Sequence, residues 1–205
     1  MGKTIWKAAA VILLAFFAPG CLAPLSSSFT GRSAGGGKVE LDGGMVSVGG
    51  LIPAFKCAAG LSSKFDLGVQ FESASIGGFA KCSIVNNQEH GFSLAGVAGG
   101  GAVASGSYFY AGPALSYLAK SFEPYFVVRY NVVHYGEPSD LFGDILWEAG
   151  TYTYVQFTLG TIIWATKHIG FDIEGSAFAG DFGLRDFEDF AVPSVVVLAG
   201  VKLRL

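Results

Sequence analysis

The final stretch of the chain, residues 192–205, alternates between two kinds of side chain. Every second residue from Val195 to Leu205 is apolar, whereas the intervening positions end in two cations, Lys202 and Arg204. Successive side chains of a β-strand point to opposite faces, so one face of this strand is uniformly apolar and the other is charged. The same pattern recurs along the chain. A strand whose apolar face meets lipid and whose polar face meets an enclosed interior is typical of a transmembrane β-barrel.

The composition supports a membrane protein built from strands. Charged residues make up 14% of the 205 residues, compared with about 25% in a soluble domain, and the mean hydropathy is +0.49. Beyond residue 20 there is no run of about 18 apolar residues that would span a membrane as a helix. The net charge is −3 and the basic residues are scattered, which excludes a nucleic-acid-binding surface.

The amino terminus has the pattern of an export signal. Lys3 and Lys7 precede an apolar stretch, residues 8–18, and small residues follow before Cys21. We interpret residues 1–20 as a signal peptide. Gly20-Cys21 resembles the processing site of bacterial lipoproteins, in which the cysteine receives the lipid; the alternative is a plain secretory signal with an incidental cysteine. The Ser- and Gly-rich residues 21–37 then predict a flexible, lipid-anchored linker.

Residues 38–205 predict an all-β domain, an up-and-down antiparallel transmembrane β-barrel. About ten strands are predicted, and eight is the alternative because the glycine-rich stretch at 99–106 is ambiguous. The strand-like segments are 38–48, 53–61, 64–72, 76–85, 90–98, 107–119, 122–135, 151–165, 168–180 and 192–205.

The connections between these segments predict how the barrel is oriented. Four are short (62–63, 86–89, 120–121 and 166–167), and every other connection is expected to be equal or longer. Outer-membrane barrels have short periplasmic turns and longer external loops. Counting from a periplasmic start, the four short turns fall on the periplasmic side, and the long connections 136–150 and 181–191 fall outside. We therefore expect both termini of the mature chain to be periplasmic.

Over residues 38–205 the chain resembles the small bacterial outer-membrane β-barrels of the OmpA-like or OmpX-like size class. The resemblance rests on the alternating strands and their turns, and it implies a location in the bacterial outer membrane and contact with its lipid. One departure is Leu205, because members of such families often end in Phe or Trp.

Charged residues on the inferred inward faces nearly balance, with six acids and five bases. Charges enclosed in a narrow barrel need partners, which predicts a salt-bridge network that fills the lumen. Eight strands leave an interior just filled by side chains, and an open channel needs about sixteen, so the alternative of a narrow channel or small-solute transporter is less favoured. The inward set is Glu40, Asp42, Lys56, Asp66, Glu72, Lys81, Arg129, Asp172, Glu174, Lys202 and Arg204.

The two long connections are candidate contact surfaces for an envelope or extracellular protein, although their aromatic residues would also suit a lid over the barrel mouth. The candidate contact residues are Phe142, Trp147, Phe182 and Phe187. His134, followed by Glu137 and Ser139, suggests a hydrolase at the rim, but this spacing matches no nucleophile motif. No catalytic residue, metal site or cofactor is therefore predicted.

Together these observations predict a non-enzymatic outer-membrane lipoprotein that serves as a structural or surface-interaction component of the cell envelope. Three alternatives stay open: a narrow channel, a rim hydrolase acting on envelope lipid or peptide, and a soluble lipid-carrying barrel. The last would require apolar side chains to face inward.

Overall fold

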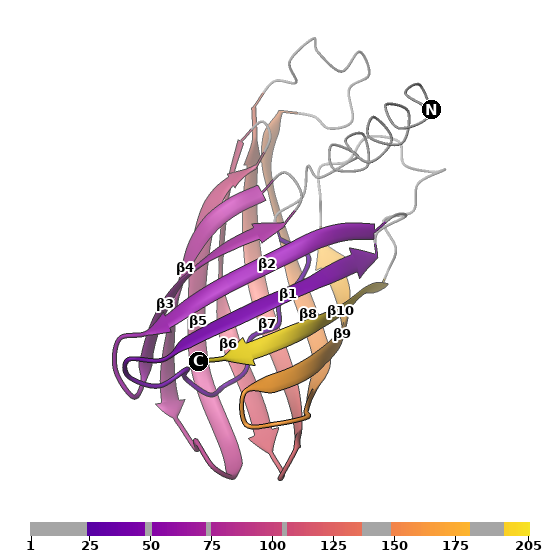
Figure 1. Ribbon diagram of the computed structural model, residues 1–205. Coiled ribbons are helices and arrows are strands. Elements are labelled where there is room, and N and C mark those ends of the chain that lie inside the picture. Colours follow the sequence, from indigo (N-terminus) through magenta and orange to yellow (C-terminus); the bar gives the residue numbers. More distant parts are fainter. Residues whose placement is uncertain (1–23, 48–50, 73–74, 104–105, 137–148, 181–194) are drawn as a thin grey trace, which may run out of the picture.

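Ten strands, the number expected from the alternation, form a closed barrel in the computed structural model (Figure 1). The structure describes residues 24–47, 51–72, 75–103, 106–136, 149–180 and 195–205. The strands are β1 (Val39–Ser47), β2 (Leu51–Gly60), β3 (Phe65–Glu72), β4 (Ser75–Val85), β5 (Gly91–Val103), β6 (Gly106–Leu118), β7 (Phe122–Tyr135), β8 (Gly150–Trp164), β9 (Ile169–Gly180) and β10 (Val195–Arg204).

The sheet closes because β1 pairs with both β2 and β10, while every other strand pairs with its neighbours in sequence. Leu41, for example, lies opposite Cys57 of β2 and Leu203 of β10. All these pairings are antiparallel, so the predicted up-and-down barrel is confirmed. Closure removes free sheet edges, which leaves no row of unpaired strand backbone groups on the surface.

The glycine-rich stretch at 99–106 belongs largely to strands β5 and β6. A Cβ on Gly99 would lie 2.5 Å from the hydroxyl oxygen of Tyr110, and a Cβ on Gly160 would lie 2.3 Å from Cζ of Tyr125. These glycines make room for tyrosine rings that enter the lumen from neighbouring strands. Their role is close packing inside a strand.

The two ends of the barrel differ in their connections. The turn end carries connections 61–64, 86–90, 119–121 and 165–168, and the loop end carries 48–50, 73–74, 104–105, 136–149 and 181–194. The expectation that every loop-end connection equals or exceeds the short turns is wrong, because three of them span only two or three residues. The two long connections nevertheless share the loop end, so the asymmetry rests on them alone.

Alternation along each strand separates an apolar outer face from an inner face that carries the charged side chains of the strands together with apolar and aromatic ones. Phe65 and Val201 are 36% and 40% exposed on the lateral surface, whereas Arg129 and Glu174 are 0% and 3% exposed. This is the orientation predicted for strands that face lipid. Charged side chains line the interior, whereas a soluble lipid carrier would require an apolar one. No helix within the described ranges is long and apolar enough to cross a membrane.

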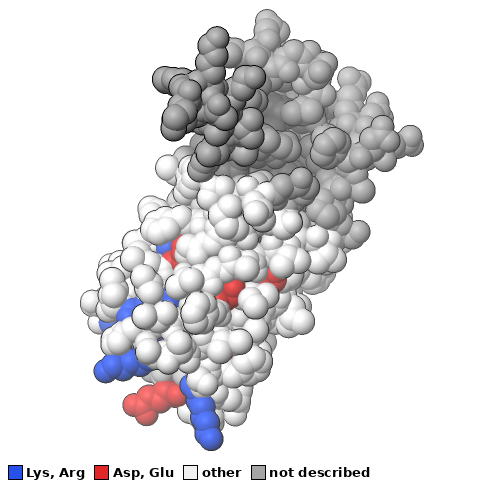
Figure 2. Space-filling view, turned by 45° about the vertical axis from the view of Figure 1, so that its right-hand side comes forward, with Lys and Arg blue, Asp and Glu red and all other residues white. Residues whose placement is uncertain are grey.

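Exposed charged side chains of the described residues gather at the turn end. They are Lys38, Lys64, Glu89, Lys120 and Lys167, and none of them lies within a strand. Figure 2 shows charged side chains protruding at this end, below a mostly uncharged lateral surface. The barrel wall therefore has an apolar outside and a charged rim at one end.

Candidate functional site in the barrel lumen

The lumen holds the chain's own amino-terminal segment. Residues 24–35 are all buried, and the indigo trace in Figure 1 runs inside the barrel before β1 begins. We call residues 24–37 the luminal segment. The prediction of a flexible linker is wrong for this part of 21–37, because small side chains that suit a linker also fit a narrow, occupied lumen. Cys21 lies outside the described residues.

The luminal segment runs from the loop end toward the turn end. Leu25 packs with Val46, Ile52 and Leu198, which lie toward the loop end. At the other end of the segment, the Gly37 amide donates to the carbonyl of Gly60 at 2.8 Å. The first described residues therefore lie toward the end opposite Leu205, so the structure does not support the expectation that both termini share the periplasmic side.

Three wall carboxylates accept hydrogen bonds from backbone N–H groups of the luminal segment. Glu72 accepts from Leu25 at 2.8 Å and from Ser26 at 3.0 Å. Glu174 accepts from Ser27 at 2.7 Å and from Ser28 at 2.6 Å. Asp66 accepts from Ala34 through both oxygens, at 3.2 and 3.1 Å. A buried segment without secondary structure needs such partners, since an unpaired buried N–H is costly.

Wall donors bind the carbonyl oxygens of the same segment. The Lys202 ammonium donates to the carbonyl of Ser28 at 2.9 Å, and the Lys81 ammonium donates to that of Arg32 at 2.6 Å. Further donors and their carbonyl partners are Arg129 to Pro24, Gln156 to Leu25, Lys56 to Ser27 and Ser83 to Gly31. The carboxylates of the wall thus bind N–H groups of the segment, and the lysine and arginine side chains of the wall bind its carbonyl groups.

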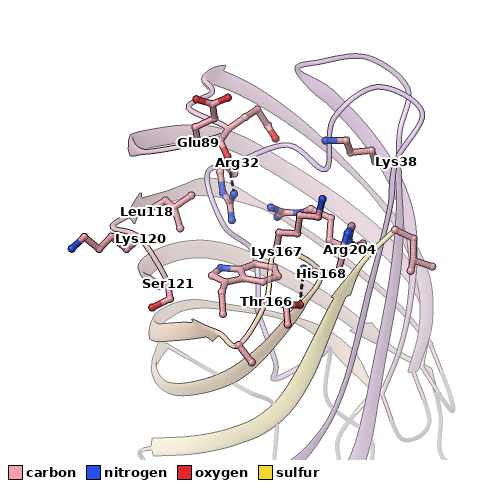
Figure 3. Close-up of a pocket in the computed structure, with 14 residues that line it drawn as sticks. Arg32, Lys38, Glu89, Leu118, Lys120, Ser121, Thr166, Lys167, His168 and Arg204 are labelled. Atoms are coloured by element: carbon pink, nitrogen blue, oxygen red, sulfur yellow. Dashed lines mark hydrogen bonds between the residues drawn. The ribbon is translucent and has the colours of Figure 1, made fainter.

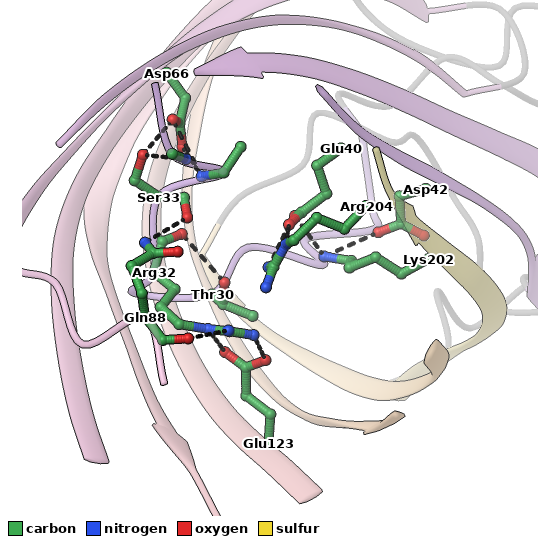
Figure 4. A network of polar contacts seen from close by, with 12 residues as sticks. Thr30, Arg32, Ser33, Glu40, Asp42, Asp66, Gln88, Glu123, Lys202 and Arg204 are labelled. Atoms are coloured by element: carbon green, nitrogen blue, oxygen red, sulfur yellow. Dashed lines mark hydrogen bonds and ion pairs between the residues drawn. The ribbon is translucent and has the colours of Figure 1, made fainter. Parts of the chain in front are cut away.

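Buried ion pairs cluster toward the turn end (Figure 4). Arg32 of the luminal segment pairs with Glu123 of β7 through two guanidinium nitrogens, one of them at 2.9 Å. Separately, Lys202 lies 3.3 Å from Glu40, and Arg204 lies 2.6 Å from the same carboxylate. The first pair joins segment to wall and the second set joins β1 to β10, so charge pairing closes the barrel as well as filling it.

An aromatic layer packs around Phe29, the bulkiest apolar side chain that the luminal segment contributes. Phe29 meets Phe79 edge-on with ring centroids 4.9 Å apart, and it lies 6.3 Å from the ring of Tyr110. The Lys56 ammonium sits 4.5 Å from the centroid of the Phe29 ring. Such contacts are favourable in a desolvated site. Phe29 therefore fixes the segment by packing in addition to hydrogen bonds.

All eleven residues of the predicted inward set are buried, with Arg204 the most exposed at 9%. Their partners differ from the simple prediction of acid–base pairing. Ion pairs join Asp66 with Lys81, and Glu40 and Asp42 with Lys202. Much of the remaining set binds peptide backbone: Glu72, Glu174, Lys56 and Arg129.

The candidate set of inward charges left out several members of this site. Glu123 and Gln70 share the inward faces of β7 and β3 with Arg129 and Asp66, and Gln156 lies inward on β8, so strict alternation places all three in the lumen. Gln70 bridges the hydroxyl groups of Tyr108 and Tyr110 at 2.9 Å each. Arg32 carried no such signal, because its surroundings read as a linker.

At the turn end the structure forms a basic cavity of about 850 Å³ (Figure 3). Trp164 lies beneath two guanidinium groups, Arg204 at 4.8 Å and Arg32 at 5.6 Å from its ring centroid, and its indole N–H donates to Glu123 at 2.9 Å. Lys38, Lys120 and Lys167 also line the cavity. The luminal segment contributes part of the lining, so the cavity belongs to the same structure.

The remaining sequence candidates form no second site among the residues that the structure describes. Phe142, Trp147, Phe182 and Phe187 lie outside the described residues, as do Glu137 and Ser139. His134 is exposed, with its Nδ1 3.1 Å from the hydroxyl of Thr151. Within the described ranges, no group of three or more His, Cys, Asp or Glu residues could hold a metal ion.

Comparison with known proteins shows similarity at the level of the barrel alone. No family model and no curated protein sequence matches the chain. The N-terminal β-barrel domain of Pseudomonas aeruginosa OprF is similar with a TM-score of 0.43 and 10% identity, covering 83% of this chain and 99% of that one. The outer membrane protein OprG from Pseudomonas aeruginosa is similar with a TM-score of 0.40 and 8% identity, covering 86% and 99%.

Proposed function

We propose that this chain is a non-enzymatic β-barrel of the bacterial outer membrane that serves as a structural or surface-interaction component of the envelope. The apolar lateral surface supports a lipid surrounding. Leu159, Leu67 and Ile173, for example, are 67%, 44% and 52% exposed on three different strands. A soluble protein rarely exposes a continuous apolar belt of this kind. The two long connections at the loop end support placing that end outside the cell.

The buried luminal segment favours a sealed barrel over a channel. Its backbone is bound by wall residues at successive levels, from Glu72 near the loop end to Asp66 near the turn end. Phe29 and Arg32 fill the lumen between and beside these contacts. A solute has no continuous aqueous path along a lumen occupied in this way, so we expect a barrel that does not conduct.

Planar-bilayer recording of the full-length protein tests this proposal. We expect no single-channel steps, while an open porin reconstituted in parallel gives them. Folding is checked by the shift in gel mobility between unheated and heated samples. Sustained currents from correctly folded wild-type protein would overturn the sealed barrel and favour the narrow channel.

The proposal includes a lipid on Cys21 and a partner protein that contacts the long connections, through the four aromatic residues named above. Metabolic labelling with a fatty acid tests the lipid: the label should be lost in Cys21→Ser and kept in the matched control Cys57→Ser. Labelling that survives in Cys21→Ser would remove lipidation from the proposal.

The rim-hydrolase alternative predicts an activity toward envelope lipid or peptide that His134→Ala abolishes.

A further inference from the structure

The direction of the luminal segment determines where the chain enters the barrel. Leu25 packs against Ile52 at the start of β2, whereas Gly37 bonds to Gly60 at the end of the same strand. The segment therefore passes from one level of β2 to the other before the chain turns back into β1. It crosses the lumen once, entering on the loop-end side and leaving at the turn end.

Chain length then limits where an amino end near Cys21 can lie. Ile52 and Gly60 are eight residue steps apart, about 26 Å along the strand and about 20 Å along the axis of a tilted barrel. Four residue steps separate Cys21 from Leu25, and they reach about 14 Å at most. Residues 26–35 of the segment occupy the lumen between Leu25 and the turn-end cavity. An amino end created at Cys21 therefore cannot reach the turn end through the barrel.

We propose that the barrel threads its own amino-terminal segment through its lumen and presents the mature amino end on the external face of the outer membrane. This inference rests on the proposed function for its inside and outside, and on the luminal segment for its direction. A lipid carried by Cys21 would then meet the outer leaflet of the membrane that the barrel spans. The amino and carboxyl ends of the mature chain would lie on opposite sides.

The contacts of the segment hold it in this direction. Ser27 and Ser28 are bound on the N–H side by Glu174 and on the carbonyl side by Lys56 and Lys202. Because every non-proline residue offers the same two backbone groups, the side chains set the register: Arg32 pairs with Glu123, and Phe29 packs edge-on against Phe79. The wall contacts and these two side chains together hold the segment in one position.

Tag accessibility on intact cells tests the proposal with the full-length chain. One protease-cleavable epitope is inserted after Ala23, a second in the connection 137–148, and a third between Lys120 and Ser121 in a turn-end connection. We expect the first two to be cleaved on intact cells and the third to be cleaved only after the outer membrane is permeabilised. Gel-mobility shifts on heating confirm that each variant is folded.

The outcomes separate the two proposals. Protection of the Ala23 tag together with the Lys120 tag would overturn external presentation. Cleavage of the Lys120 tag with protection of both others would instead overturn the proposed orientation of the barrel, and threading toward the loop end would stand. A smaller probe guards against tags that disturb folding: Ala23→Cys in a Cys57→Ala, Cys82→Ala background, treated with a membrane-impermeant maleimide, should react on intact cells.

Discussion

Replacing Glu174 by glutamine is the sharpest single test of how the luminal segment is held. One carboxylate oxygen of Glu174 accepts from the Ser27 amide at 2.7 Å. The other accepts from the Ser28 amide at 2.6 Å and from the Tyr125 hydroxyl at 2.8 Å. Glutamine keeps the shape but has only one acceptor oxygen. Its NH₂ group must then face a buried backbone N–H.

The expected loss follows from these contacts. A buried N–H left without an acceptor costs about 1–3 kcal/mol, and a neutral acceptor is weaker than a charged one by about 1 kcal/mol. Together these terms weaken binding of the segment by about 3 kcal/mol, which multiplies the fraction of barrels with a displaced segment by about 150. The matched control is Glu89→Gln, because Glu89 is exposed at the turn end.

Two measurements report how often the luminal segment is displaced. Open-channel events in planar bilayers should appear in Glu174→Gln, because the displaced fraction rises about 150-fold, and should stay below detection in wild type and Glu89→Gln. Independently, a Ser27→Cys reporter with the other cysteines removed should react faster with a soluble maleimide when Glu174→Gln is present. A folded Glu174→Gln barrel that stays sealed and unreactive would refute the assignment of Glu174 as a clamp on the segment.

Three further predictions concern the segment and the lipid face. Gly31→Val should displace the segment and raise conductance, since a Cβ there would lie 2.3 Å from a carbonyl oxygen of β5, whereas the control Gly36→Val should not, since a Cβ there comes no closer than 3.5 Å. Equal conductance of the two variants would contradict the packing of Gly31 against β5. Arg32→Met leaves the buried carboxylate of Glu123 without its cation and should lower the free energy of unfolding by about 3–5 kcal/mol in denaturant titrations in detergent, whereas Arg32→Lys should lose less. An unchanged free energy in Arg32→Met would show that the pair does not stabilise the barrel. In lipid vesicles, Leu159→Arg near the middle of the wall should lower the free energy of unfolding by about 2–4 kcal/mol, and Leu61→Arg at the rim should lower it by at most about 1 kcal/mol. Equal losses would argue against a lipid-facing belt.

The barrel could be predicted from the sequence because its signal is local. Alternation needs only neighbouring residues, and both the number of strands and the burial of residues such as Arg129 follow from it. The predicted number of strands was ambiguous where one local composition suits two kinds of structure. Glycines at 99–106 suit a loop, and they equally suit a strand that must make room for Tyr110.

The partners of the lumen charges could not be predicted in the same way. Glu174 and Ser27 are 147 positions apart, and no periodicity in the sequence connects them. Carboxylates and amines on inward faces suggested pairing with one another, which holds for Lys81 and Asp66. Glu174 instead binds backbone N–H groups, which every non-proline residue carries and which leave no mark in a sequence pattern.

The sequence by itself determined that the strands have one apolar face and one face with charged side chains, because this pattern repeats every two residues. Only the tertiary structure decided what the polar faces enclose. A run of Ser, Gly and Ala has low preference for any local conformation, so its state depends on surroundings that arrive from distant strands. Here a closed ring of fixed donors and acceptors surrounds residues 24–35 and orders a segment that would otherwise behave as a flexible chain.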